Sequence, residues 1–190
     1  MSSTNRGYKR HKSDYYVTPI KDIKLFIDEI VKYESNIFDG KILDPCAGGD
    51  KSHKMSYPTA LLGKRVTDNI NTIDIRKDSR AEIITNYLEF NPNKKYDCII
   101  TNPPFKIARD IIEKSLKDVK ENGFVIMLLR LNYFGTQKRF DLWQEYMPKY
   151  TFVHHKRMSF TDKGGTDSIE YAHFVWQKGN YPEFTKLKVI

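Results

Sequence analysis

The residues with the clearest chemistry are Asn102-Pro103-Pro104-Phe105, which follow the apolar run Cys98-Ile99-Ile100-Thr101. Such a run predicts a buried strand, with the four residues at its carboxyl end. The Asn102 side-chain oxygen and the Pro103 carbonyl, which meets no N–H from the next proline, can both accept hydrogens from one amine. Phe105 offers a ring on which a planar base can stack. The motif suits an exocyclic amine such as that of adenine, whose lone pair must leave the ring system before it can react. The alternative is a pair of prolines that only ends a strand.

A glycine-rich turn follows an upstream apolar run, at Asp44-Pro45-Cys46-Ala47-Gly48-Gly49-Asp50. Glycines there let backbone N–H groups approach a ligand closely, as in nucleotide-binding α/β folds. The turn has neither the G-x-G-x-x-G spacing of dinucleotide sites nor the Gly-Lys-Ser/Thr of phosphate loops, which argues against NAD and ATP. The next expected strand, Thr72-Ile73-Asp74-Ile75, ends near an acid. A carboxylate at that place can bind both hydroxyls of a ribose. Taken alone, Asp74 is better explained as a solvated charge at a strand end, and the ribose role gains support only from its order with the Asp44 turn and Asn102.

In this order, the Asp44 turn, Asp74 and Asn102-Pro103-Pro104-Phe105 resemble the motifs of S-adenosylmethionine-dependent N6-adenine DNA methyltransferases. The likeness is closest to the small enzymes carried by bacteriophages and prophages, and it runs from about Tyr15 to Gly179. Further segments that fit the family are Tyr16-Val17-Thr18-Pro19, Met55-Ser56-Tyr57-Pro58, Asp74-Ile75-Arg76, Leu129-Arg130-Leu131-Asn132, Lys138-Arg139-Phe140, and the stretch from Lys156-Arg157-Met158-Ser159-Phe160 through 164–168.

The resemblance implies a fold and a cofactor. The fold is the α/β, Rossmann-like class I methyltransferase fold, a doubly wound and mostly parallel sheet that ends in an antiparallel hairpin. In such sheets ligands bind beyond the carboxyl ends of the strands, where Asp44, Asp74 and Asn102 are expected. The cofactor is S-adenosylmethionine, and the residues expected to bind it are Tyr16, Thr18, Pro19, Asp44, Pro45, Cys46, Ala47, Gly48, Asp74, Ile75, Asn86, Tyr87 and Asn102.

Three of these assignments have alternatives. Thr18 is expected to close over the carboxylate of the cofactor, but a threonine before Pro19 is also a good helix cap. Asn86 stands where related enzymes commonly have an acid, so its contact with the cofactor has lost a charge. Tyr87 either packs beside the cofactor or fills the core.

The resemblance also implies how DNA is handled. Asn102, Pro103, Pro104 and Phe105 are the expected catalytic residues. They hold an adenine that has rotated out of the base stack and orient its amine for direct attack on the methyl group, without a strong general base.

Phe160 is the candidate for a second ring on the base, and a core aromatic is the alternative. Lys138 and Arg139 are expected to touch phosphates or base edges, and a solvated helix start is the alternative. No insertion is long enough for a target-recognition domain, which predicts a short or relaxed recognition sequence.

Composition is consistent with a nucleic-acid partner. The chain of 190 residues carries a net charge of +8, which suits duplex or single-stranded DNA. We expect a flexible basic arm over 1–14, where Arg6 to Lys12 can lie along phosphates, followed by a single catalytic domain over 15–190. An ordinary disordered terminus is the alternative for the arm. We expect a monomer or a weak dimer.

Other classes of protein are disfavoured. No apolar stretch reaches the roughly 18 residues that span a bilayer, and no signal peptide is evident. Cys46 and Cys98 lack metal-site spacing, so no metal is expected. A cytoplasmic location follows, in a bacterium or a phage-infected host cell.

Apolar periodicity predicts alternating elements. The expected helices cover 23–31, 58–62, 107–119 and 137–146, and the third is closed by Asn122-Gly123. The expected strands are 41–44, one from Thr72, 98–101, 124–129, 150–155 and, as the last, 170–177.

Three other functions remain open. An RNA N6-adenine methyltransferase shares the same pocket chemistry. A protein glutamine methyltransferase also uses Asn-Pro-Pro, but usually with tyrosine next and an added amino-terminal domain. A catalytically inactive nucleic-acid-binding module would need none of Asn102, Pro103 and Asp44.

Overall fold

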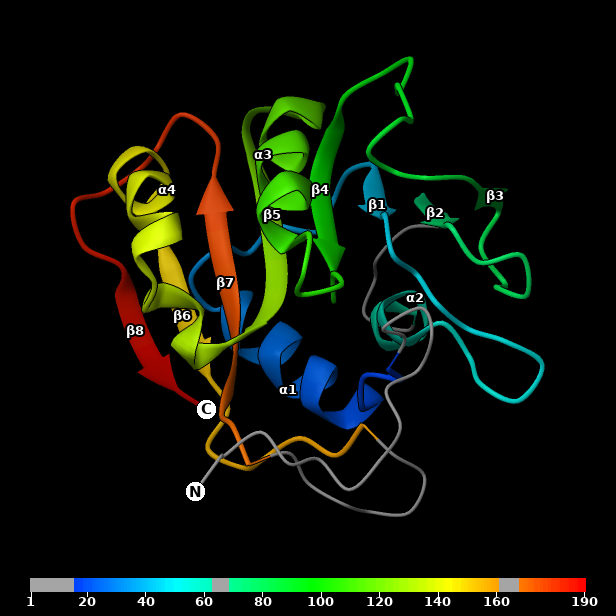
Figure 1. The fold of residues 1–190 in the computed structure, drawn as a ribbon, viewed down its shortest axis with the longest axis horizontal. Coiled ribbons are helices and arrows are strands. Elements are labelled where there is room, and N and C mark those ends of the chain that lie inside the picture. Colours follow the sequence, from blue (N-terminus) through cyan, green and yellow to red (C-terminus); the bar gives the residue numbers. More distant parts are fainter. Residues whose placement is uncertain (1–15, 63–68, 161–167) are drawn as a thin grey trace.

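The protein is built on one mostly parallel sheet with helices on both faces (Figure 1). The computed structural model describes residues 16–62, 69–160 and 168–190. Within these ranges the sheet has 8 strands in the order β3-β2-β1-β4-β5-β7-β6-β8. The elements are α1 (Ile20–Ile30), β1 (Ile42–Asp44), α2 (Ser56–Leu61), β2 (Ile70–Asp74), β3 (Ile83–Ile84), β4 (Tyr96–Thr101), α3 (Ala108–Asp118), β5 (Val119–Arg130), the 3₁₀ turns η1 (Leu131–Phe134) and η2 (Gln137–Arg139), α4 (Phe140–Glu145), β6 (Tyr150–Val153), β7 (Tyr171–Gln177) and β8 (Lys186–Val189).

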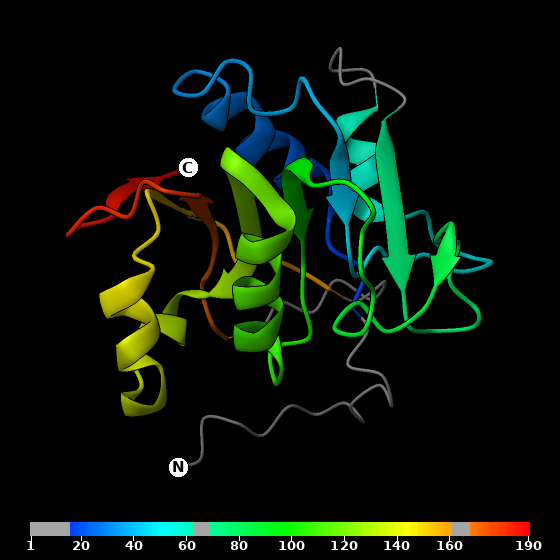
Figure 2. The same ribbon diagram turned by 90° about the horizontal axis from the view of Figure 1, so that it is seen from above.

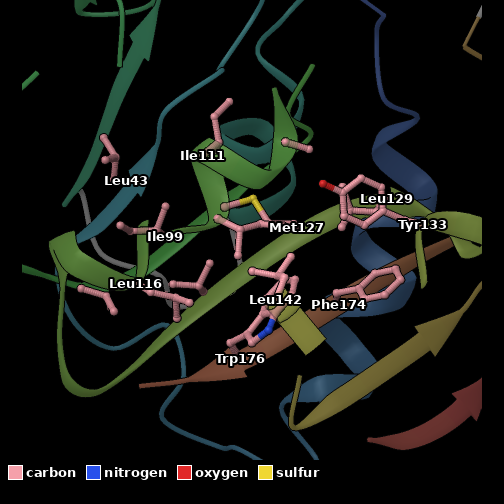
Figure 3. Close-up of a cluster of buried hydrophobic side chains, with 14 of the residues drawn as sticks. Leu43, Ile99, Ile111, Leu116, Met127, Leu129, Tyr133, Leu142, Phe174 and Trp176 are labelled. Atoms are coloured by element: carbon pink, nitrogen blue, oxygen red, sulfur yellow. The ribbon is translucent and has the colours of Figure 1, made fainter. Parts of the chain in front are cut away.

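Two separate hydrophobic clusters hold the helices to the sheet. Successive strand residues point to opposite faces, so Ile42 of β1 packs with α1 and α2, whereas Leu43 packs with α3 and α4. Seen from above, α1 and α2 lie on one side of the sheet and α3 and α4 on the other (Figure 2). Figure 3 shows the cluster on the α3 and α4 side of the sheet, which includes Ile99 of β4, Met127 of β5, Ile111 of α3 and Trp176 of β7. Strands buried on both faces explain the continuous apolar runs in the sequence.

The predicted fold class is confirmed. Strands β3, β2, β1, β4 and β5 pair in parallel, and β7 is antiparallel to both β5 and β6. The β6–β7 pair is the expected hairpin. However, β7 is not the last strand, because β8 pairs in parallel with β6 at the edge of the sheet. Its four residues, Lys-Leu-Lys-Val, are all exposed, so burial of an apolar face does not hold this short strand in place.

Some boundaries predicted from the sequence are wrong. Helix α3 ends at Asp118 rather than at Asn122-Gly123, because Val119 already pairs with Tyr96 of β4. Asn122 does adopt the left-handed conformation, with φ of 62°. Gly123 lies so near β4 that a Cβ atom there would be 2.8 Å from the Asp97 carbonyl oxygen. These two residues therefore lie in the irregular stretch of β5 between its pairing at Val119 and its regular pairing with β4 from Phe124 onward.

The predicted basic arm, 1–14, lies outside the described residues, and so does most of 164–168. In the described ranges no helix is long and apolar enough to cross a membrane. The same ranges contain no group of three or more His, Cys, Asp or Glu side chains arranged to hold a metal ion.

Candidate active site

A pocket opens where the strand order reverses, between β1 and its neighbours β2 and β4. Asp44, Asp74 and Thr101 are the last residues of these three strands, so the fold brings the predicted residues to one rim. The space there is about 910 Å³ when the open solvent at its mouth is included. Its lining includes most of the predicted site, namely Tyr16, Thr18, Pro45, Cys46, Ala47, Gly48, Asp74, Ile75, Asn86, Tyr87, Asn102, Pro103, Pro104 and Phe105.

Asp44 is a buried carboxylate in which one oxygen accepts hydrogen bonds and the other has no hydrogen-bond partner in the described residues. Its side chain is 1% exposed. Oδ1 accepts hydrogen bonds from the Thr101 hydroxyl, at 2.6 Å, and from the Cys46 N–H, at 3.2 Å. Oδ2 is buried and has no hydrogen-bond partner in the described part of the chain. Burial raises the pKa of Asp44 to about 7, and the nearby Asp74 charge adds to this shift. A cationic group beside Asp44 would therefore be well matched to it.

Asp74 shapes the glycine turn from the neighbouring strand. Its Oδ2 accepts the Gly48 N–H at 2.7 Å, and its Oδ1 accepts the Arg76 N–H at 2.8 Å. Gly48 and Gly49 have φ of 64° and 73°, which favours glycine at both positions. Arg76 completes the arrangement by donating from Nη2 to the Gly49 carbonyl at 2.7 Å. A carboxylate has about four acceptor sites, so Asp74 keeps the capacity to bind hydroxyl groups.

Asn102 has its two amide ends in different settings. Nδ2 donates to the Thr18 hydroxyl oxygen at 3.0 Å. Oδ1 is buried and has no hydrogen-bond partner in the described ranges. Thr18 does not cap α1, because the N-cap residue is Pro19 and no side chain caps that helix end. The site thus contains a buried acceptor without a donor, and Phe105 lines the same pocket.

Four aromatic rings join the separate segments of the site. Phe105 packs 5.9 Å from Tyr171, and the Arg130 guanidinium lies 4.9 Å from the centre of the Phe105 ring. Phe160 lies between Tyr171, at 4.8 Å, and Tyr16, at 6.3 Å. Phe160 does not line the pocket, so its predicted role on the target base stays a prediction.

Other predicted residues have partners away from the pocket. Asn86 accepts the Leu88 N–H and donates to Glu89, so its side chain closes a local turn. The Tyr87 hydroxyl donates to Asp118 of α3 at 3.0 Å, which directs it into the core. Pro19 is the N-cap residue of α1, and neither Pro19 nor Asp44 lines the pocket.

The two predicted DNA contacts differ from each other. Lys138 is exposed. Arg139 instead donates from Nε to the Tyr133 carbonyl at 2.8 Å and stacks 3.9 Å over the Tyr133 ring. Neither residue lines the pocket, and the structure leaves both DNA roles as predictions.

The structure also brings to the pocket residues that were not assigned to the site from the sequence. Val17, Gly49, Ser56, Tyr57, Arg76, Leu88, Ile107 and Ile111 also line the pocket. Five of them, Val17, Gly49, Ser56, Tyr57 and Arg76, stand in the glycine turn or in segments that resemble the family. The other three, Leu88, Ile107 and Ile111, are ordinary apolar residues that only the fold places there.

A buried polar chain leads away from the pocket wall. The Tyr57 hydroxyl is 3.1 Å from His173 Nε2, and His173 Nδ1 is 2.8 Å from His154 Nε2. Burial lowers the pKa of His154 to about 4 and lowers that of His173 well below its usual value. His173 lies within the apolar run of β7, where alternation alone gives no reason to expect a polar network.

Comparison with known proteins identifies the fold. No protein-family model and no curated protein matches the sequence. A Listeria monocytogenes protein assigned as a class I S-adenosylmethionine-dependent methyltransferase matches with a TM-score of 0.62 and 14% identity, over 92% of this chain and 65% of that chain. A Pyrococcus horikoshii protein assigned as an RNA methyltransferase gives 0.61 and 18%, over 93% and 94%. A modification subunit assigned to a type I restriction enzyme of Vibrio vulnificus gives 0.59 and 12%, over 93% and 47%.

The chain has the Rossmann-like class I methyltransferase fold. It spans less than two thirds of the Listeria protein and about half of the Vibrio subunit. Identities this low show the fold alone, so the resemblance to small phage and prophage enzymes stays a prediction.

Proposed function

We propose that this protein is an S-adenosylmethionine-dependent methyltransferase that acts on the N6 amine of adenine in DNA. The observation that carries the proposal is the buried, unpartnered Oδ1 of Asn102, placed beside Pro103-Pro104-Phe105 at the end of β4. An acceptor without a partner costs free energy in a protein interior, which the amine of a bound base would recover.

The residues present fit the cofactor. Asp44 keeps an unpartnered, buried oxygen and a raised pKa, so its charged form is costly until a cation arrives. S-adenosylmethionine has a cationic ammonium group and a sulfonium centre, and it supplies an electrophilic methyl group when bound. Asp74 would hold the ribose hydroxyls, and Ile75, which is 66% exposed, offers an apolar surface to the adenine ring of the cofactor.

The chain's own groups would orient the target amine. Asn102 Oδ1 and the Pro103 carbonyl accept its two hydrogens, which draws the nitrogen toward tetrahedral geometry and frees its lone pair. Phe105 stacks on the base after it has left the duplex. The nitrogen loses its proton readily once it carries a positive charge, so water can accept that proton and no strong base is needed.

The choice of DNA rests on charge and on the sequence resemblance. A net charge of +8 favours a polyanion but does not distinguish DNA from RNA. The similarity to the Pyrococcus protein over 94% of that chain makes an RNA substrate the second candidate. No segment between the described elements is long enough for a separate target-recognition domain, which supports a short or relaxed recognition sequence.

The test is a methyl-transfer assay with labelled S-adenosylmethionine on duplex DNA, single-stranded DNA and total RNA, followed by mass analysis of nucleosides. Asn102→Ala is the active-site variant. Asn91→Ala is the matched control, because Asn91 also precedes a proline but is exposed in a loop.

The proposal requires N6-methyladenine in DNA that is lost in Asn102→Ala and kept in Asn91→Ala. Label in RNA alone would move the protein to the second candidate. Equal activity of the two variants would remove Asn102 from the mechanism.

A further inference from the structure

We infer that Arg130 is a positioning residue that holds the ring of Phe105 in place from outside the pocket, so that the ring is already oriented when the target base stacks on it. The inference rests on the proposed function, in which Phe105 is the ring that receives the base. Arg130 lies in a segment that resembles the family, but it does not line the pocket and has no role in the proposed chemistry.

Strand pairing brings Arg130 and Tyr171 together. Arg130 is the last residue of β5 and Tyr171 is the first residue of β7, and the two lie directly opposite each other in the antiparallel ladder. The side chains of such a pair project from the same face of the sheet and contact each other. Arg130 Nε donates to the Tyr171 hydroxyl at 3.4 Å. The two side chains therefore form a platform at the rim of the sheet where β5 ends.

Phe105, from the loop after β4, packs against both members of this platform. The guanidinium carbon of Arg130 lies 4.9 Å from the centre of the Phe105 ring, which is within the distance of about 6 Å for a cation–π interaction. The centre of the Tyr171 ring is 5.9 Å away, and the two ring planes are tilted by 38°. Tyr171 is buried, whereas Arg130 and Phe105 are half-buried. A cation and a second ring thus fix a side chain that would otherwise rotate.

The platform and the pocket use different parts of the Phe105 side chain. Phe105 lines the pocket, whereas Arg130 and Tyr171 do not. The part of the ring that faces the pocket therefore stays available to a ligand. Ordering a side chain on binding costs free energy, so a ring that is held beforehand stacks on the base more favourably. That gain helps to offset the cost of taking the base out of the duplex.

Two other roles for Arg130 make different predictions. If Arg130 contacts a phosphate, its loss reduces the slope of log affinity for DNA against log salt by about 1. If its side chain occupies the place that the base must take, its loss raises activity. A positioning role instead predicts lower activity, an unchanged salt slope, and no effect once the Phe105 ring is absent.

The test compares Arg130→Met with Arg130→Lys, each in the unmodified chain and in Phe105→Leu. Methionine keeps a long apolar stem without the charge, whereas lysine keeps the cation. Lys41→Met is the matched control, because Lys41 Nζ also lies 4.9 Å from a ring centre, that of Tyr96, but where β1 and β4 begin. The measurements are kcat/KM for DNA, the salt slope of DNA binding, the Kd of S-adenosylmethionine and the thermal midpoint.

We expect Arg130→Met to lower kcat/KM for DNA roughly three- to thirtyfold, as for loss of a cation–π contact. Arg130→Lys is expected to lie between Arg130→Met and the unmodified chain, because lysine restores the cation without the planar group. In Phe105→Leu, Arg130→Met is expected to lower kcat/KM by less than about twofold. The Kd of the cofactor and the activity of Lys41→Met are expected to stay within about twofold of the unmodified chain.

Several results would overturn the inference. The same loss of kcat/KM with and without the Phe105 ring would mean a merely structural role for Arg130. A salt slope reduced by about 1 in Arg130→Met would make Arg130 a phosphate contact, and a raised activity would place it where the base must go. No methylation of adenine by the unmodified chain would reject the proposed function and, with it, the inference. An active chain with a fully active Arg130→Met variant would reject the inference alone.

Discussion

Replacing Asp44 with asparagine is expected to change how the stability of the fold depends on pH. Burial raises the pKa of Asp44 from 3.8 to about 7, so the folded state takes up the proton before the unfolded state as the pH falls. Asp44 therefore adds stability as the pH falls from 7 toward 3.8. His154 has the opposite effect, because burial lowers its pKa from 6.5 to about 4. The unfolded state then takes up that proton first, and stability is lost as the pH falls from 6.5 toward 4.

The two effects are of similar size. One pKa unit corresponds to about 1.4 kcal/mol. On acidification to pH 5, folded Asp44 is protonated over about two pH units, from its pKa of about 7 downward. Unfolded His154 is protonated over about one and a half pH units, from its pKa of 6.5 downward. Asp44 contributes a gain of about 3 kcal/mol over this interval, and His154 a loss of about 2 kcal/mol. The two nearly cancel in the unmodified chain. His173, whose pKa is also lowered by burial, adds a further loss to every variant that keeps it.

The assay is urea unfolding at pH 7.5 and pH 5 at one ionic strength, followed by fluorescence of the buried Trp143 and Trp176. Compared with the unmodified chain, Asp44→Asn is expected to lose about 3 kcal/mol more on acidification. His154→Gln, which keeps a polar group near His173, is expected to lose about 2 kcal/mol less.

Comparing variants removes the contribution of other titrating groups. The pKa values of Asp50 and Asp97 are lowered by their hydrogen bonds and charged partners, so these carboxyls titrate below the chosen interval in all chains. If Asp44→Asn and the unmodified chain show the same change within about 0.5 kcal/mol, the raised pKa of Asp44 is wrong. The case for Asp44 as the partner of a cationic ligand would then also fail.

Three further predictions concern the turn, the buried polar chain and the DNA contacts. Gly49→Ala places a Cβ atom 2.9 Å from Met55 Cγ at φ of 73°. It is therefore expected to destabilise the fold by about 1–3 kcal/mol and to weaken cofactor binding in calorimetry. An unchanged stability together with an unchanged cofactor affinity would contradict the assigned turn geometry. Tyr57→Phe removes the hydroxyl beside His173 and is expected to cost about 1–3 kcal/mol in thermal unfolding, and a neutral result would show that the bond does not stabilise the fold. If Lys138 touches a phosphate, Lys138→Ala reduces the slope of log affinity for DNA against log salt by about 1. Arg139→Ala is expected to change this slope less, because Arg139 is bound to Tyr133. A larger change in slope for Arg139→Ala than for Lys138→Ala would exchange their roles.

Features that depend on neighbouring residues in the chain could be predicted from the sequence. The apolar runs that became β1, β4 and β5 are buried on both faces, so their pattern is strong. The helix predicted over 107–119 formed as α3, because its apolar positions recur at helical spacing. The hairpin of β6 and β7, by contrast, was expected from the resemblance to methyltransferases and not from a local pattern.

Features that depend on pairing with distant segments could not be predicted. Strands β3 and β8 are short and exposed, and they are strands only because β2 and β6 offer them an edge. Asn122-Gly123 is a real turn signal, but the pairing of Val119 with Tyr96 ended α3 earlier. Local propensity is a weak preference that tertiary contacts readily override.

The candidate site divides in the same way. The sequence by itself determined which groups are available, because Asn102-Pro103-Pro104-Phe105 and the glycine turn after Asp44 are local patterns whose chemistry is evident from residue type. Only the tertiary structure decided what each group meets, from the Thr101 hydroxyl on Asp44 to the Thr18 hydroxyl on Asn102. Those partners lie 57 and 84 residues away in the chain. No local pattern specifies a hydrogen bond over such a separation, because its geometry is set by the packing of the whole sheet and its helices.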